Sequence, residues 1–168
     1  MKELLIKIIR LKIEYLSRRL KYYMNQTENS KRLYIVAKNL LYPQRDVTPD
    51  DIVPDEVACA EALSYVLKLC GVQGIPRNGI PSTIDLFKFL SSSEQFIKVE
   101  TPLAGDVIIS VTGTGNGRLV GHCGIVGVVN VMNNNSETGI WVASYTLTQW
   151  EKRYKEYAGM ATHYFRFL

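Results

Sequence analysis

The sequence predicts an α+β fold, with helices in the first half of the chain and an antiparallel sheet in the second. Apolar residues recur every three or four positions as far as Leu90, which is the spacing of amphipathic helices. After Leu90, short runs rich in β-branched and aromatic residues follow one another, as in strands. Helices first and strands afterwards are typical of an α+β domain.

The composition is that of a globular protein. The 168 residues suffice for one domain with a buried core, alone or with an appendage. The hydrophobic share of 46% and the charged share of 21% argue against disorder. The net charge of +4 is concentrated at the start, since residues 1–22 carry seven Lys or Arg and two Glu. A nucleic-acid-binding module would need basic residues with interleaved aromatics beyond this segment, so no nucleic-acid partner is predicted.

The first two predicted helices are set apart from the rest of the chain. Residues 3–24 predict a basic amphipathic helix, because apolar side chains recur at helical spacing between Lys and Arg residues. This helix could bind an anionic membrane or wall polymer, or it could pack on its own domain. A second helix is predicted over residues 31–41. Together they form a predicted N-terminal helical extension of residues 1–43, and residues 44–168 form the main domain.

Neither a signal peptide nor a transmembrane span is predicted, because Lys7, Arg10 and Lys12 interrupt the first apolar run. No disulfide is predicted either. The three cysteines form no CxxC motif, and Cys59 and Cys70 lie on one predicted helix, separated by about 16 Å of helical rise. This indicates a compartment in which free thiols survive.

The main domain begins with two predicted helices. Pro54 to Cys70 forms the first, with Asp55 as its N-cap and Gly71 as its C-terminal stop. Ser82 and the residue after it cap the second helix, which continues through Leu90. The remaining predicted elements are strands over residues 96–99, 106–111, 122–129, 139–145 and 163–167, a turn at Asn133-Asn134-Asn135, and a helix over residues 147–157.

Cys59 and His122 are the candidate reactive pair. Cys59 falls in the first turn of its predicted helix, where the positive dipole end and the free amides stabilise a thiolate and could contribute to an oxyanion hole. His122 begins an apolar strand after a glycine-rich loop, where substrates can reach side chains. Cys123 points to the other face of that strand and is predicted to be a core thiol. A buried structural cysteine and a structural histidine are the alternatives.

Other reactive roles find less support. Two histidines and three cysteines without ligand spacing predict no metal site, and no cofactor is predicted. The glycine-rich residues 113–117 lack the lysine and the following helix of a phosphate-binding loop. His163, in the last strand, is predicted to be structural. Trp141, Trp150 and Tyr145 could line a groove or belong to the core.

The order of four sequence elements resembles a known family. Cys59 at a helix start is followed by the segments Gly105–Gly127 and Trp141–Tyr154 and by a closing strand at residues 164–167. Over about residues 50–168 this order resembles the CHAP and NlpC-like cysteine hydrolases of peptidoglycan, above all the endopeptidase-type domains of phages and prophages. The resemblance implies a papain-like fold, with helices packed on an antiparallel sheet.

The resemblance also implies an activity. Cys59 would be the nucleophile and His122 the general base, acting on amide bonds of the cell-wall peptide or on the bond that joins the peptide to the sugar. The partner would be bacterial peptidoglycan, in lysis of the host or passage through its wall. The protein would then reside in the host cytoplasm before its release to the wall, or in the phage virion.

The third site residue departs from the family pattern. Relatives place an Asn or an acidic residue on the strand after the histidine hairpin, and Ser144 is the predicted counterpart here. They often carry Gln before the cysteine, where this chain has Ala58. A thiol amidase, acyltransferase or toxin of the same fold acting on another amide is one alternative. A non-catalytic wall-binding relative is the other.

Overall fold

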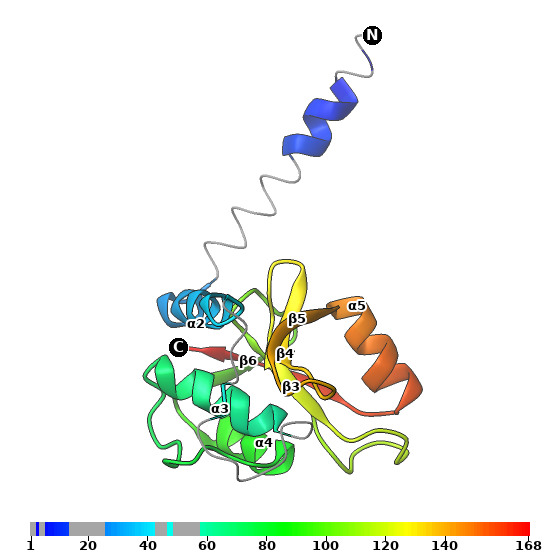
Figure 1. Cartoon of the computed structure of the whole chain (residues 1–168). Coiled ribbons are helices and arrows are strands. Elements are labelled where there is room, and N and C mark those ends of the chain that lie inside the picture. Colours follow the sequence, from blue (N-terminus) through cyan, green and yellow to red (C-terminus); the bar gives the residue numbers. More distant parts are fainter. Residues whose placement is uncertain (1–2, 4–5, 14–25, 43–46, 49–57) are drawn as a thin grey trace.

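The computed structural model describes residues 3, 6–13, 26–42, 47–48 and 58–168. The described part is built on a six-stranded antiparallel sheet in the order β1-β6-β2-β3-β4-β5 (Figure 1). The strands are β1 Phe96–Val99, β2 Val107–Ser110, β3 His122–Ile125, β4 Asn130–Asn134, β5 Trp141–Thr146 and β6 Thr162–Phe167. The helices are α2 Glu28–Asn39, α3 Cys59–Leu69, α4 Thr83–Ser92, α5 Leu147–Trp150 and the π-helix η2 Glu151–Tyr157.

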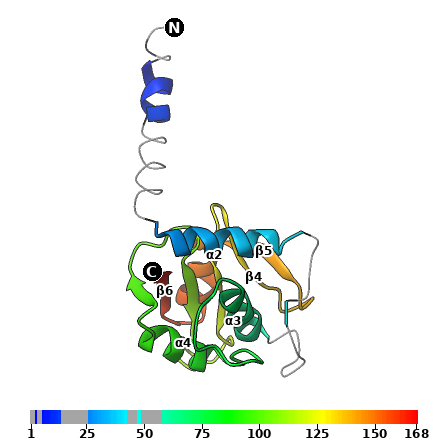
Figure 2. The ribbon, with the colours of Figure 1, turned by 90° about the vertical axis from the view of Figure 1, so that its left-hand side faces the viewer.

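The two faces of the sheet bury different layers of the protein. Side chains alternate between the faces of a strand. In β2, Val107 and Ile109 join a core that also holds buried residues of α2, α3 and α4. Ile108 between them joins a second core with Trp150 of α5 and Tyr154 of η2. Figure 1 shows α3 and α4 grouped together, apart from α5, and Figure 2 shows α3 and α4 together again, beneath α2. The predicted α+β class, with helices packed on an antiparallel sheet, is confirmed.

Helix α2 shares the main core. Leu33 and Ala37 are fully buried in it, and the Trp141 indole donates a hydrogen bond of 3.0 Å to the Ala37 carbonyl oxygen. The helix also lies directly against the loop before β2. Gly105 adopts φ +90° there, and a Cβ at this position would collide with the Ser30 carbonyl oxygen. A glycine is therefore required for α2 to approach this closely.

These contacts bear on the predicted N-terminal extension of residues 1–43. Helix α2 belongs to the main core together with α3 and α4. A separate N-terminal extension would therefore comprise only residues that precede α2. Of the predicted helix over residues 3–24, residues 3 and 6–13 are helical and exposed, and the rest lies outside the described residues. Its binding to an anionic membrane or wall polymer stays a prediction. Within the described part, no helix is long and apolar enough to cross a membrane.

Side chains cap the starts of α2 and α4, whereas α3 begins without a side-chain cap. Helix α3 begins at Cys59 with Ala58 as its N-cap residue, whereas the predicted cap Asp55 lies outside the described residues. The Ser82 side chain caps α4 as predicted. Helix α2 begins earlier than predicted, because the Thr27 side chain accepts a hydrogen bond from the third amide beyond it and so starts the helix there.

One strand was predicted wrongly. The predicted strand 122–129 ends as β3 at Ile125, and the chain reverses at Gly127 into β4. A Cβ at Gly127 would collide with the carbonyl oxygen of Asn130, so the turn is tight. The sequence predicts a turn at Asn133, because asparagine is depleted in strands. The other predicted strands agree with β1, β2, β5 and β6 to within two residues at each end.

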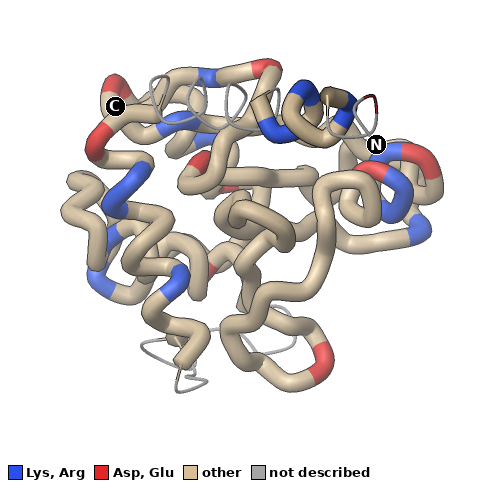
Figure 3. The backbone as a smooth tube through the Cα atoms, turned by 90° about the horizontal axis from the view of Figure 1, so that it is seen from above, with Lys and Arg blue, Asp and Glu red and all other residues tan. Residues whose placement is uncertain are grey.

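Charged positions lie mostly around the outside of the described chain, with Lys and Arg interspersed among Asp and Glu (Figure 3). Asp106, just before β2, is an exception because it is fully buried. Its carboxylate pairs with Arg166 of β6 at 2.7 Å and accepts a hydrogen bond from the Leu103 amide, also at 2.7 Å. These bonds tie the start of β2 to its neighbour β6, which fixes the strand that precedes the His122 loop.

Candidate active site

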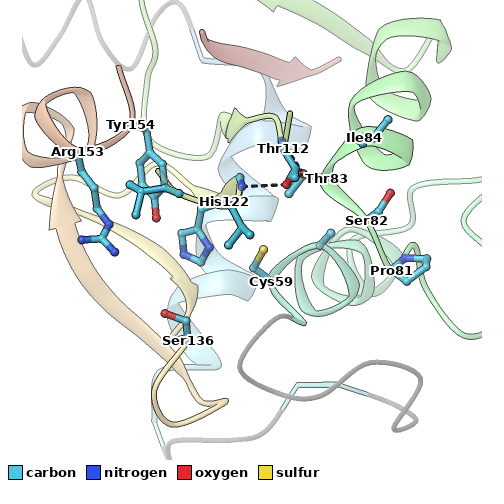
Figure 4. A pocket seen from close by; sticks show the side chains of 14 residues that line it. Cys59, Pro81, Ser82, Thr83, Ile84, Thr112, His122, Ser136, Arg153 and Tyr154 are labelled. Atoms are coloured by element: carbon cyan, nitrogen blue, oxygen red, sulfur yellow. Dashed lines mark hydrogen bonds between the residues drawn. The ribbon is translucent and has the colours of Figure 1, made fainter. Parts of the chain in front are cut away.

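Cys59 is the first residue of α3, and its side chain points toward His122 (Figure 4). The residue is 8% exposed, so its thiol is sheltered but reachable. Helix α3 is fixed by Ala62, Leu63 and Val66, which are fully buried against the sheet side of the core. The first amides of a helix have no partner within the helix, and the dipole is positive at that end. The fold therefore holds the Cys59 sulfur where a negative charge is stabilised.

His122 begins β3 and faces the α5 and η2 side of the sheet. Its ring stacks on Trp150, with 5.4 Å between ring centroids and 24° between planes, and on Tyr154 at 5.9 Å and 18°. Trp150 is fully buried and donates its indole N–H to the Ser110 hydroxyl at 3.0 Å. Cys123, the next residue, lies in the opposite core, as the alternation of the strand predicts. The two aromatic rings hold the imidazole plane in place.

Asn133 contacts the Nε2 atom of the His122 imidazole. His122 Nε2 lies 3.1 Å from Asn133 Oδ1. The Asn133 amide nitrogen donates to the Val131 carbonyl oxygen at 3.0 Å and to the Ser144 hydroxyl at 2.9 Å. Since both amide hydrogens are used, the oxygen must face the imidazole, and Nε2 must carry the proton. This leaves Nδ1 as the nitrogen available to Cys59.

The predicted third site residue, Ser144, stays a prediction, and the structure adds Asn133 as a second candidate for that role. The structure places Ser144 behind Asn133, where its hydroxyl accepts from the Asn133 amide, and Asn133 is the direct hydrogen-bond partner of His122. Asn133 lies in β4 and Ser144 lies in the neighbouring strand β5. The sequence pattern predicts a turn at Asn133, so it does not indicate Asn133 as a site residue. The signal that could have found it is the tight Gly127 reversal, which leaves room for a short second strand.

The pair has a pKa pattern suited to ion-pair formation. The neighbouring Cys123 thiol and the charge of His122 lower the pKa of the Cys59 thiol well below its usual value, against the opposing effect of burial. Burial acts to lower the pKa of His122, but the Cys59 thiolate and the hydrogen bond with Asn133 outweigh it, and the pKa is raised. A thiolate and an imidazolium are therefore favoured together.

The other two cysteines remain thiols. Burial raises the pKa of Cys123 well above its ordinary value, and its Sγ donates a hydrogen bond of 3.2 Å to the Cys59 carbonyl oxygen. Cys123 is fully buried, which confirms that it is a core thiol. Burial also raises the pKa of Cys70 to about 11. Among the described residues all three cysteines are free.

A cleft of about 250 Å³ opens over the Cys59 thiol and the His122 imidazole (Figure 4). Its walls are tied together by hydrogen bonds: the Thr83 and Thr112 hydroxyls lie 2.9 Å apart, and the Gly121 amide donates to the Thr112 hydroxyl at 2.8 Å. A second cavity of about 150 Å³ adjoins it on the imidazole side. The second cavity, called here the side cavity, is lined by His122, Asn133, Asn135, Ser136, Glu137, Ser144, Tyr145 and Arg153.

The remaining candidates lie outside the reactive centre or at its edge. His163 is half-buried, contacts the Phe87 ring at 4.8 Å and lines neither cavity. Trp141 and Trp150 are fully buried and belong to the core, while Tyr145 lines the side cavity. Across the part of the chain that the structure describes, no group of three or more His, Cys, Asp or Glu is placed to hold a metal ion.

Comparison with known proteins adds one structure. No protein-family model matches the chain, and no curated protein matches it. A chain from the crystal structure of the type VI native effector–immunity complex Tae3–Tai3 from Ralstonia pickettii is similar at a TM-score of 0.48 and 19% sequence identity. The match covers 84% of this chain and 100% of that chain.

Proposed function

We propose that this protein hydrolyses amide bonds in the peptides of bacterial peptidoglycan by a Cys–His thiol mechanism. One observation carries the proposal: Cys59 and His122 line the same cleft, and Asn133 holds the imidazole from behind. The lowered pKa of Cys59 and the raised pKa of His122 favour the reactive ion pair. A nucleophile, a base and an orienting group in one cleft form the arrangement that acyl transfer requires.

The reaction follows from these positions. The Cys59 thiolate attacks the amide carbonyl carbon, and the carbonyl oxygen takes up the negative charge. The amides at the start of α3 are suited to stabilise that charge. The His122 imidazolium gives its Nδ1 proton to the leaving nitrogen, so an amine departs and a thioester remains on Cys59. The imidazole then takes a proton from water, whose hydroxide attacks the thioester. The carboxylic acid is released and the thiolate is restored.

The choice of peptidoglycan rests on the sequence segments that resemble wall hydrolases. Gly105–Gly127 contains β2, the loop that lines the cleft, and the start of β3 with His122. Trp141–Tyr154 contains β5, α5 and the start of η2, whose Trp150 and Tyr154 stack on the imidazole. Both segments therefore build the reactive side of the cleft, which is where substrate preference is determined. A role in host lysis or wall passage belongs to the same proposal.

Digestion of purified peptidoglycan tests the function directly. The protein should release fragments that carry new amino groups, detectable by amine labelling, and mass spectrometry of the fragments should show the addition of one water per cut. New reducing sugar ends should not appear, because a thiol amidase does not cut glycosidic bonds. Fragments identical to those from a buffer control, or fragments with only new reducing ends, would contradict the proposal.

Asn133 should matter more than Ser144 for the reaction. Asn133→Ala removes the hydrogen bond to the imidazole and is expected to lower kcat/KM about 10- to 100-fold. Ser144→Ala, which affects the imidazole only through Asn133, should cost about threefold or less. Since the bond with Asn133 raises the pKa of His122, Asn133→Ala should also move the alkaline limb of the pH–rate profile to lower pH.

Steady-state kinetics of the two variants over a range of pH provide the measurement, with thermal melting as the control for folding. A Ser144→Ala effect as large as that of Asn133→Ala would restore Ser144 to the third position. An unchanged alkaline limb in a folded Asn133→Ala protein would argue that Asn133 has no influence on the imidazole.

A further inference from the structure

Arg153 is the cationic side chain that the cleft and the side cavity share. It lines both of them, and it also lines a third cavity of about 470 Å³ with Ser144 and Tyr145. In Figure 4 its guanidinium lies beside the His122 ring, on the side away from Cys59. A ligand that occupied the cleft and extended past the imidazole would therefore meet this charge.

The Arg153 guanidinium lies against two aromatic rings. Arg153 lies above the rings of Tyr145 at 5.9 Å and Tyr154 at 5.8 Å from the ring centroids. Both Arg153 and Tyr154 line the cleft, and both belong to the π-helix η2. π-helical turns are frequent at functional sites. Arg153 itself is exposed, so a ligand can reach the guanidinium from solvent while the two rings lie against it.

The charge has no carboxylate partner in the described structure. The ion pairs found among the described residues are Lys31–Glu28, Lys88–Asp85 and Arg166–Asp106. Glu137 is the acidic residue that lines the side cavity, and it is exposed. A guanidinium presents a planar fork of N–H donors that matches the two oxygens of a carboxylate. The position therefore suits an anionic group of the substrate.

The proton transfer from His122 indicates which fragment of the substrate would carry the anionic group. The imidazolium must protonate the leaving nitrogen, so the amine fragment lies on the His122 side of the cleft. Arg153 lies on that same side. We propose that Arg153 binds a carboxylate on the residue that leaves with the amine, and that it thereby selects peptides with an acidic group next to the cut bond. This inference rests on the proposed function, because it requires an amide substrate.

A bound carboxylate would also assist the reactive pair. The charge of Arg153 acts to lower the pKa of His122. A carboxylate on the guanidinium neutralises that effect and favours the imidazolium that must donate its proton. The carboxylate could be the C-terminal group of the leaving residue or a group on its side chain, and the test separates these two sources.

The test compares synthetic peptide amides that differ only in the leaving residue. One peptide ends in a free α-carboxylate, the second ends in a carboxamide, and the third has a carboxamide end but an acidic side chain. Wild type should cleave one of the acidic peptides with a kcat/KM about 10- to 100-fold higher than the neutral one. Arg153→Gln should cleave acidic and neutral peptides at similar rates, and Arg153→Lys should recover part of the preference.

Arg118 provides a matched control. It lies over the Tyr157 ring at 5.2 Å, as Arg153 lies over its own rings, but it lines neither the cleft nor the side cavity. Arg118→Gln should keep the wild-type preference. Wild type without any preference for an acidic peptide, or a folded Arg153→Gln protein with the preference intact, would overturn the proposal.

Binding separates this inference from the proposed function. If wild type cleaves none of the peptides and releases nothing from peptidoglycan, the proposed function fails. The same three peptides can then be titrated into Cys59→Ala by calorimetry. One acidic peptide should bind about tenfold or more tightly than the neutral one, and the added change Arg153→Gln should abolish the difference. Equal binding of all three peptides would refute the carboxylate site.

Discussion

Cys59→Ala is expected to abolish hydrolysis, with kcat lower than that of wild type by about 10⁴-fold or more. The substitution removes the sulfur that attacks the carbonyl carbon, and no neighbouring group replaces it. Cys123 is fully buried and its pKa is raised well above the ordinary value, so it stays a thiol. Alanine is small and suits a helix start flanked by Ala58 and Ala60, so the fold should persist. Release of amino groups from peptidoglycan measures the effect.

Cys70→Ala is the matched control for this prediction. Cys70 is also buried, but it follows the far end of α3, and burial raises its pKa to about 11. The variant should keep full activity and lose about 1 kcal/mol of stability from the deleted sulfur. Labelling with iodoacetamide should modify Cys59 much faster than Cys70, with a midpoint well below pH 8.5. Hydrolysis that survives Cys59→Ala would exclude the thiol mechanism.

His122→Ala is expected to lower kcat/KM about 10³- to 10⁴-fold, because it removes both the base and the proton donor of the leaving group. The charge of His122 contributes to the lowered pKa of Cys59, so the variant should also need a higher pH for alkylation of the thiol. His163→Ala is the control, since His163 contacts Phe87 and lines neither cavity. It should retain wild-type rates.

The pH profile of wild type follows from the same two groups. As pH falls through the lowered pKa of Cys59, the thiolate is protonated and the rate drops. As pH rises through the raised pKa of His122, the imidazolium is lost and the rate drops again. The profile should be a bell whose apparent pKa values belong to the coupled pair. A single sigmoidal rise near pH 8.5, the ordinary value of a free thiol, would show that no ion pair forms.

Several features of the fold could be read from local patterns. The Ser82 cap and the strands β1, β2 and β6 agree with the sequence predictions, because capping and β-branched runs are local signals. Cys59 at a helix start and His122 at a strand start were predicted for the same reason. The place of α2 in the core was not predicted, because its contacts with the sheet and with Trp141 join residues far apart in the chain.

The positions of Asn133 and Arg153 beside the imidazole depend on tertiary structure. Asn133 lies in a strand because β4 pairs with both β3 and β5, and this pairing outweighs the low strand preference of asparagine. Arg153 lies beside the imidazole because η2 packs on the face of the sheet opposite to α3. The sequence by itself predicted Cys59 and His122 as candidates, through the local structure at each of them. Only the folded chain brings Asn133 and Arg153 beside His122, because hydrogen bonds and cavities between distant segments leave no local pattern.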